Sequence, residues 1–112
     1  MGYIEKIQSM LQNGEISCVE LTEKYLKAIE EANGELNAYV TVTPEVALEQ
    51  AKQVDEKIKR GEKLLPLEGV PMTLKDNIST NGIETTCCSK ILKGYKPIYD
   101  AKVWEILKKN NA

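Results

Sequence analysis

A short apolar segment, residues 70–74 (Val-Pro-Met-Thr-Leu), ends abruptly at three polar residues, Lys75, Asp76 and Asn77. An apolar run of this length, bounded by turn-forming residues, is typical of a buried strand. Pro71 has no N–H to donate, so the predicted strand lies near a strand end or at the edge of a sheet. A strand needs partners, and this requirement constrains the fold more than any other feature of the chain.

Amphipathic helices are predicted before this segment. Apolar residues recur at helical spacing between residues 4 and 11, and Asn13-Gly14 provides the stop signal. Residues 17–20 (Ser-Cys-Val-Glu) form a capping box, which predicts a second helix over residues 17–32. Asn33-Gly34 is expected to end that helix.

Strand and helix signals then alternate. Residues 38–42 (Ala-Tyr-Val-Thr-Val) predict a short strand. Thr43 is expected to cap a third helix over residues 44–60, which has Pro44 at its first position. A last helix is predicted from Asp100, as its N-cap, to the asparagines at the end of the chain.

These elements predict an α/β fold that needs more strands than the chain supplies. Residues 1–61 are expected to be mainly helical, and residues 62–112 to contain the strand, the Lys-Asp-Asn motif and the last helix. A sheet of two or three strands would leave its edges uncovered. We therefore expect the chain to be the truncated N-terminal part of a single, larger α/β domain.

Composition excludes several function classes. The chain has 112 residues, the usual size of one domain, and a net charge of −2. No basic field favours direct nucleic-acid binding. No apolar run is long enough to span a bilayer, and the N-terminus has no features of a signal peptide.

The cysteines and the lack of histidine narrow the chemistry. Three cysteines, two of them adjacent, form a poor disulfide framework and fit a reducing cytoplasm. A chain with no histidine cannot form a histidine-based catalytic triad or a histidine-ligated zinc site. We therefore expect a cytoplasmic protein with no metal site and no cofactor of its own.

Two interpretations of Lys75 are open. A lysine at a strand terminus is usually a solvated surface residue. Alternatively, a lysine held against an apolar strand loses water, which lowers its pKa and favours the neutral amine that acts as a base. Asp76 and Asn77 would then orient the amine or form the next turn, and turn formation is the more common role of asparagine.

Other nucleophiles lie near Lys75 in the sequence. Ser79 and Ser89 make a local Ser-Lys dyad an alternative. Cys87 and Cys88 are candidate thiol nucleophiles. Because no histidine is present to activate them, we interpret both as small, buried packing residues.

Two segments resemble a known family. "PLEGVPMTLKDNIST" (66–80) and "GIETTCCSKIL" (82–92) look like the amidase signature family. The segment "SKILKGYKPIYDAKVWEIL" (89–107) is most similar to one branch, the A subunits of glutamyl-tRNA(Gln) amidotransferases. The resemblance covers nearly the whole chain. It implies that the chain is the first piece of an α/β/α sandwich built on a mixed sheet.

The resemblance also implies a chemistry that needs no histidine. The family hydrolyses amides with a Ser–cis-Ser–Lys triad, in which Lys75 corresponds to the base. In the amidotransferase branch the amide is glutamine. The released ammonia passes to a partner protein of the complex, which uses ATP and magnesium to amidate glutamate misacylated on tRNA(Gln). The implied partners are the B and C subunits, and the misacylated tRNA through the complex.

The chain departs from the family pattern in one large respect. Both family serines lie in a Gly/Ser-rich stretch that these 112 residues do not contain, and neither Ser79 nor Ser89 matches their positions. We therefore expect the chain alone to be inactive. A non-catalytic interaction module, or part of another amidase of the family, is the alternative. We also expect self-association through an apolar group at the end of the chain: Tyr95, Tyr99, Val103, Trp104 and Leu107.

Overall fold

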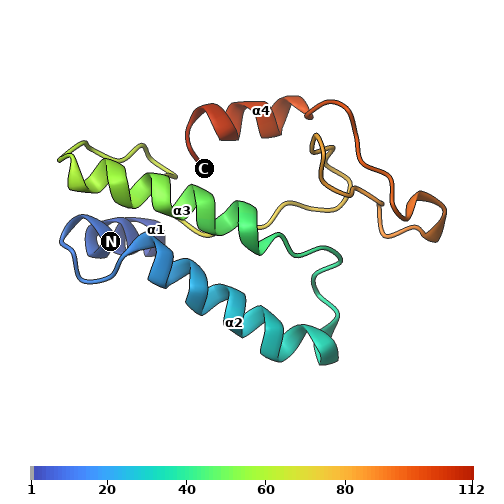
Figure 1. Cartoon of the computed structure of the whole chain (residues 1–112), viewed down its shortest axis with the longest axis horizontal. Helices are drawn as coiled ribbons and strands as arrows, with labels where there is room; N and C mark the ends of the chain where they lie inside the picture. The colour runs from blue at the N-terminus through green and yellow to red at the C-terminus, as the bar shows by residue number, and fades with distance from the viewer. Residues whose placement is uncertain (1) are drawn as a thin grey trace.

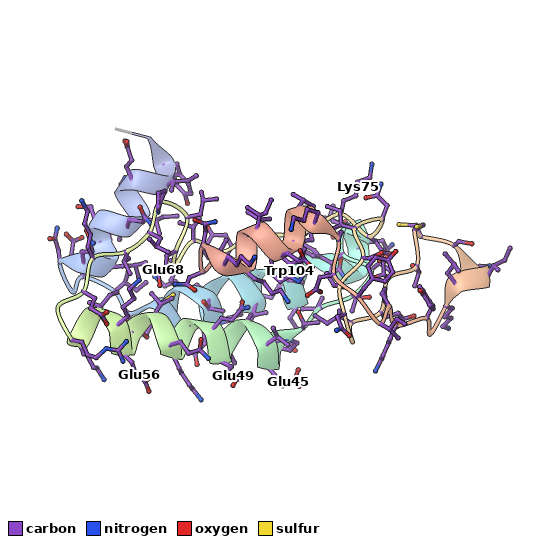
Figure 2. The ribbon with its side chains drawn as sticks, turned by 90° about the horizontal axis from the view of Figure 1, so that it is seen from above. Glu45, Glu49, Glu56, Glu68, Lys75 and Trp104 are labelled. Carbon is purple, nitrogen blue, oxygen red and sulfur yellow. The ribbon has the colours of Figure 1, made fainter. Side chains whose placement is uncertain are left out.

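The computed structural model describes residues 2–112, so Met1, where the predicted helical half begins, lies outside the described residues. The helices are α1 (Tyr3–Gln12), α2 (Cys18–Leu36), α3 (Pro44–Lys59) and α4 (Lys102–Lys109), with a short 3-10 helix, η1 (Lys90–Leu92). Helices α2 and α3 form an antiparallel pair, and α1 crosses one end of the pair (Figure 1). Helix α4 is drawn above α3 in this view, but Figure 2 shows that the two helices are set apart in depth. None of the helices in residues 2–112 is long and apolar enough to cross a membrane.

The core lies among α1, α2, α3 and the loop that follows α3. Its buried apolar side chains come from all four segments. They are Ile7, Leu11, Cys18, Ala51, Val54 and Leu64. This core accounts for part of the predicted helical faces, because Ile7 and Leu11 of α1 share it with Ala51 and Val54 of α3, whereas Ile4 of α1 remains exposed.

The start of α2 is fixed twice. The predicted capping box is confirmed: the Ser17 hydroxyl accepts the Glu20 amide at 3.1 Å, and the Glu20 carboxylate accepts the Ser17 amide at 2.9 Å. Asp55 of α3 also accepts the amides of Cys18 (2.6 Å) and Val19 (3.1 Å). A carboxylate at a helix N-terminus accepts N–H groups that have no partner within the helix, and its charge complements the helix dipole. Helix α3 therefore contacts α2 along its length and also caps its N-terminus.

Two predicted helix ends differ from the structure. Helix α2 does not stop at residue 32 but continues to Leu36, because Asn33 turns its side chain to Tyr39, accepting its amide (2.8 Å) and donating to its carbonyl (3.0 Å). The left-handed residue that ends α2 is Asn37. Helix α3 begins at Pro44 as predicted, but the Thr43 side chain makes no capping hydrogen bond.

The prediction of two strands is wrong. Residues 38–42 and 70–74 are extended or irregular, and no strand is present within residues 2–112. The physical reason is pairing: a strand is defined by a ladder of backbone hydrogen bonds, and no described segment provides one. The α/β character of the fold is therefore visible only in part, as extended segments beside the helices.

The last helix begins one residue later than predicted. Ala101 is its N-cap, and Asp100 instead accepts the Asn81 amide (2.7 Å) and the Lys108 ammonium group. Of its apolar residues, Trp104 and Leu107 are half-buried, whereas Val103 faces outward. Helix α4 thus joins the rest of the protein without a fully buried residue of its own.

Gly69 shows how closely the loop after α3 approaches the core. Its φ is +81°, and a Cβ there would lie 2.9 Å from Leu11 Cδ1 and 3.3 Å from Val54 Cγ1. The positive φ favours glycine because other residues rarely adopt this conformation. The short distances exclude a larger residue because Leu11 and Val54 are both buried and tightly packed.

We predict that Gly69→Ala lowers the free energy of unfolding by about 2–4 kcal/mol, since left-handed strain and overpacking act together. Gly82→Ala is the matched control, because Gly82 has φ +75° but no atom within 4 Å of a built Cβ. The control should cost about 1–2 kcal/mol, from strain alone. Urea denaturation of both variants is the measurement, and equal losses would contradict the packing argument.

Candidate functional site

Lys75 follows the extended segment of residues 70–74, which the sequence predicted as a strand and which is not one in the structure. The chain turns immediately afterwards, and the Lys75 carbonyl accepts the Ile78 amide at 3.0 Å. The Lys75 side chain is exposed and points away from the face of α3 that carries Glu45, Glu49 and Glu56 (Figure 2). Residues 2–112 therefore do not provide the desolvation that the base interpretation requires.

Lys75 lines a cavity of about 410 Å³, a volume typical of ligand sites. One wall is formed by α2 and α3, and others by residues 38–43 and 72–76, while Trp104 contributes from α4. Most of the lining is apolar. The charged and thiol side chains of the lining are Lys75, Asp76, Glu84 and Cys88.

Asp76 organises the loop beside Lys75. Its carboxylate accepts the Thr86 amide (3.0 Å), the Thr86 hydroxyl and the Cys88 amide (3.1 Å). Its carbonyl accepts the Cys87 amide at 2.8 Å. One residue therefore makes four hydrogen bonds to residues 86–88, which lie ten to twelve positions away in the sequence. The position of this loop relative to Lys75 depends on Asp76.

The charge of Asp76 is part of this arrangement. The hydrogen bond from the Thr86 hydroxyl, followed by the amides of Thr86 and Cys88, holds the pKa of the Asp76 carboxyl below its usual value near 3.8. Asp76 is therefore ionised at neutral pH, and its hydrogen bonds are of the stronger, charge-assisted kind. The sequence suggested that Asp76 orients Lys75 or forms a turn. In the structure, Asp76 holds the loop of residues 86–88. Within residues 2–112, no hydrogen bond joins Asp76 to the Lys75 amine.

The local serine candidates have other partners. The Ser89 hydroxyl accepts the Ile91 amide (3.3 Å) and caps η1, and the Ser79 hydroxyl donates to the Tyr99 hydroxyl (3.4 Å). Within the described residues, neither serine is hydrogen-bonded to Lys75. The structure therefore does not bring the alternative Ser-Lys dyad together.

The adjacent cysteines are exposed, so the prediction that they are buried packing residues is wrong. Cys87 and Cys88 have φ of 52° and 57°, two consecutive left-handed residues that turn the loop toward solvent while Asp76 holds their amides. Cys18 is the buried cysteine: burial, with the nearby charge of Asp55, raises its pKa to about 11. No group of three potential metal ligands occurs in residues 2–112.

A comparison with protein families matches the amidase family over residues 20–112, and the chain therefore belongs to that family. The segment matched contains the extended segment, Lys75, Asp76 and the loop that Asp76 holds.

Two curated relatives show which amidases are similar. The chain is 50% identical over 108 residues to the A subunit of the glutamyl-tRNA(Gln) amidotransferase of Carboxydothermus hydrogenoformans, covering 96% of this chain and 22% of that protein. It is 47% identical over 100 residues to the mitochondrial A subunit of the same enzyme in Rattus norvegicus, covering 89% of this chain and 19% of that protein. The chain thus spans about a fifth of the length of these relatives.

A solved structure has the same fold over the whole chain. It is described as an unexpected vestigial protein complex that reveals the evolutionary origins of an s-triazine catabolic enzyme. The TM-score is 0.89 at 31% identity, and the match covers 100% of this chain and 24% of that one. An inhibitor-bound form of that complex matches with a TM-score of 0.88.

Sequence reasoning missed two residues that place the site. Glu68 is 2% exposed, and its carboxylate accepts Lys57 Nζ (2.8 Å) and the Leu65 amide (2.8 Å). Asp55, which caps α2, was also missed. For Glu68 a signal was available, because a lone acid between two apolar stretches and next to a glycine is an unusual place for a charge.

We predict that Asp76→Asn loosens the 86–88 loop. Amide hydrogen exchange at Thr86 and Cys88 should become about tenfold faster, because charge-assisted hydrogen bonds are roughly twice as strong as neutral ones. Asp100→Asn is the control, since its partners are Asn81 and Lys108.

The same loop should loosen in acid without any substitution. A carboxyl whose folded pKa is depressed stabilises the fold above its unfolded pKa, and this contribution is lost as pH falls below about 4 through the lower folded value. Exchange or amide chemical shifts followed from about pH 6 to about pH 2 would test this. A loop that is unchanged both in the variant and in acid would contradict the assigned role.

Proposed function

We propose that the chain is part of the glutamine-hydrolysing component of a tRNA-dependent amidotransferase. Identity of 50% to the A subunit of a glutamyl-tRNA(Gln) amidotransferase, against 31% to the structural neighbour, supports this branch of the family over another amidase. The observation that carries the proposal is the placement of Lys75 at the end of the extended segment, on the cavity.

In this proposal Lys75 is the base of the Ser–cis-Ser–Lys triad. A neutral amine accepts the proton of the nucleophilic serine through the bridging serine, and the serine attacks the amide carbonyl. The same proton then returns to the amide nitrogen, the C–N bond breaks, and ammonia leaves as the acyl-enzyme forms. The neutral form requires that water be excluded around Lys75. We assign that exclusion to the parts of an amidase domain that correspond to the other four-fifths of the relatives.

The remaining roles fall to groups outside these 112 residues. Both triad serines are assigned to a Gly/Ser-rich segment that the chain does not contain, so the chain alone has a base and no nucleophile. In the proposed complex, the B and C subunits are the partners, and one of them uses ATP and magnesium to transfer the ammonia to misacylated tRNA.

We predict that the isolated chain releases no ammonia from glutamine above background, because a base without its nucleophile offers no covalent route. The positive arm is a chimera in which this chain replaces the 108 matching residues of the Carboxydothermus relative. In the chimera, Lys75→Ala should lower turnover by about 10²–10⁴-fold, the usual contribution of a general base.

Lys63→Ala is the control in the chimera, since Lys63 is exposed and lies outside the cavity. Retained glutaminase activity in the Lys75 variant would refute the assignment of the base. Turnover by the isolated chain that disappears in both Lys75→Ala and Ser89→Ala would instead restore the local dyad.

We also predict that the isolated chain self-associates at micromolar concentration. Large apolar side chains are exposed, including Tyr95, Tyr99 and Val103 of the predicted group, whereas Trp104 and Leu107 are half-buried. Exposed apolar patches of this kind drive association. Light scattering or sedimentation would report it, and a monomer with a cooperative melt would contradict it.

A further inference from the structure

Cys87 and Cys88 form an adjacent pair of thiols that the proposed function does not use. Both residues are exposed, whereas the third cysteine, Cys18, is buried in the core. Cys88 also lines the cavity on which Lys75 lies. Because Cys88 is both exposed and part of this lining, the pair lies where the cavity meets solvent. Accessible thiols in such a place can take a ligand or a modifying reagent.

The backbone of the two cysteines is held by Asp76. The amides of Thr86 and Cys88 donate to its carboxylate, and the amide of Cys87 donates to its carbonyl at 2.8 Å. These contacts use the amides of the cysteines and not their sulfur atoms. Both cysteines have a positive φ, so the turn that presents them is tightly constrained. A turn that is already ordered offers both thiols at little further cost in conformational entropy.

The spacing of the two cysteines disfavours a disulfide between them. Their Cα atoms lie about 3.8 Å apart, because a single trans peptide bond joins them. The Cα atoms of a disulfide are usually about 4.4–6.8 Å apart. We therefore expect the pair to stay reduced. A ligand atom placed between the two sulfur atoms lengthens the bridge, so it avoids this restriction.

The number of thiols and the charge of the complex select the ligand. Zinc in a structural site takes four protein ligands, whereas this pair supplies two. A cuprous ion accepts two thiolates, but that complex is anionic. The three amides of residues 86–88 that would stabilise an anion already donate to Asp76. Trivalent arsenic that carries one organic group has two positions left for thiols, and its adduct is neutral.

We propose that Cys87 and Cys88 form a dithiol site for trivalent organic arsenicals, in which the organic group lies in the apolar cavity beside Lys75. With an arsine oxide, both S–H bonds break and two As–S bonds form. The oxide oxygen takes the two protons and leaves as water. Arsenic and sulfur keep their oxidation states, so the reaction needs no oxidant or reductant. The site does not depend on the glutamine chemistry of the proposed function.

The cavity provides apolar surroundings for the organic group. Its volume is about 410 Å³, and most of its lining is apolar. Val42 and Met72 line it and are 39% and 45% exposed, so apolar surface remains for a ligand to cover. A phenyl arsenical should therefore bind more tightly than a methyl arsenical, because the ring covers more of this surface.

Intact-mass measurement on the reduced 112-residue chain tests the site, with phenylarsine oxide as the probe. The chain should gain one phenylarsine group with the loss of one water, and the competing dithiol dithiothreitol should remove it. Cys87→Ser and Cys88→Ser should each weaken binding by about 100-fold or more, because the second As–S bond forms within one molecule and is then lost. Serine keeps the amides that Asp76 binds, so the turn should be preserved.

Cys18→Ala is the matched control, because it removes a thiol and keeps the adjacent pair. It should leave binding unchanged, since Cys18 is buried away from the reagent. If this variant does not fold, peptide mapping of the adduct on the unaltered chain replaces it. The mapped arsenical should then lie on Cys87 and Cys88.

A comparison of phenylarsine oxide with methylarsine oxide tests the position of the organic group. Dithiothreitol is the reference, because it binds both reagents and has no cavity. The preference for the phenyl reagent should be about tenfold larger for the chain than for dithiothreitol, which corresponds to the burial of roughly 50–60 Å² of additional apolar surface.

Three results would overturn the proposal. The first is binding of unchanged affinity in either serine variant, which would show that a single thiol is sufficient. The second is the loss of two hydrogens from Cys87 and Cys88 in air, which would show that a disulfide forms despite their spacing. The third is the same preference for the phenyl reagent in the chain and in dithiothreitol, which would place the organic group outside the cavity.

Discussion

The placement of the site depends on one buried ion pair. Glu68 is almost completely enclosed, and its carboxylate is compensated by Lys57 of α3 and by the Leu65 amide. A buried carboxylate is tolerated only when it is paired and hydrogen-bonded, so these contacts fix the loop after α3 in one place. Gly69 then lies against Leu11 and Val54, and the extended segment leaves the core in a defined direction toward Lys75.

A second carboxylate acts at the other end of that segment. Asp76 binds the loop of residues 86–88, as Glu68 binds the loop before Gly69. The five residues that follow Gly69 up to Leu74 are thus held at both ends, and most of their backbone is free. A segment constrained in this way has already lost much of its conformational entropy.

The helical half was largely predictable from sequence, because its signals are local. The capping box at Ser17 and the proline at the start of α3 act within one turn of helix, and both helices begin where they indicate. The structure of residues 70–74 could not be predicted in the same way. An apolar pattern identifies a segment that is suited to a sheet, but a strand forms only where a second segment pairs with it. The exposure of Cys87 was missed because it results from the contacts of Asp76, far away along the chain.

The buried core also has a consequence for synthesis. All of its members, from Ile7 to Leu64, and the glycine that packs on them, belong to the first seventy residues of the sequence. Chains emerge from the ribosome N-terminal end first, and domains or parts of them can organise in that order. The three-helix unit can therefore close while later residues are still being made. The later residues of the chain, including Lys75 and the loop that Asp76 holds, then fold against a helical unit that is already formed.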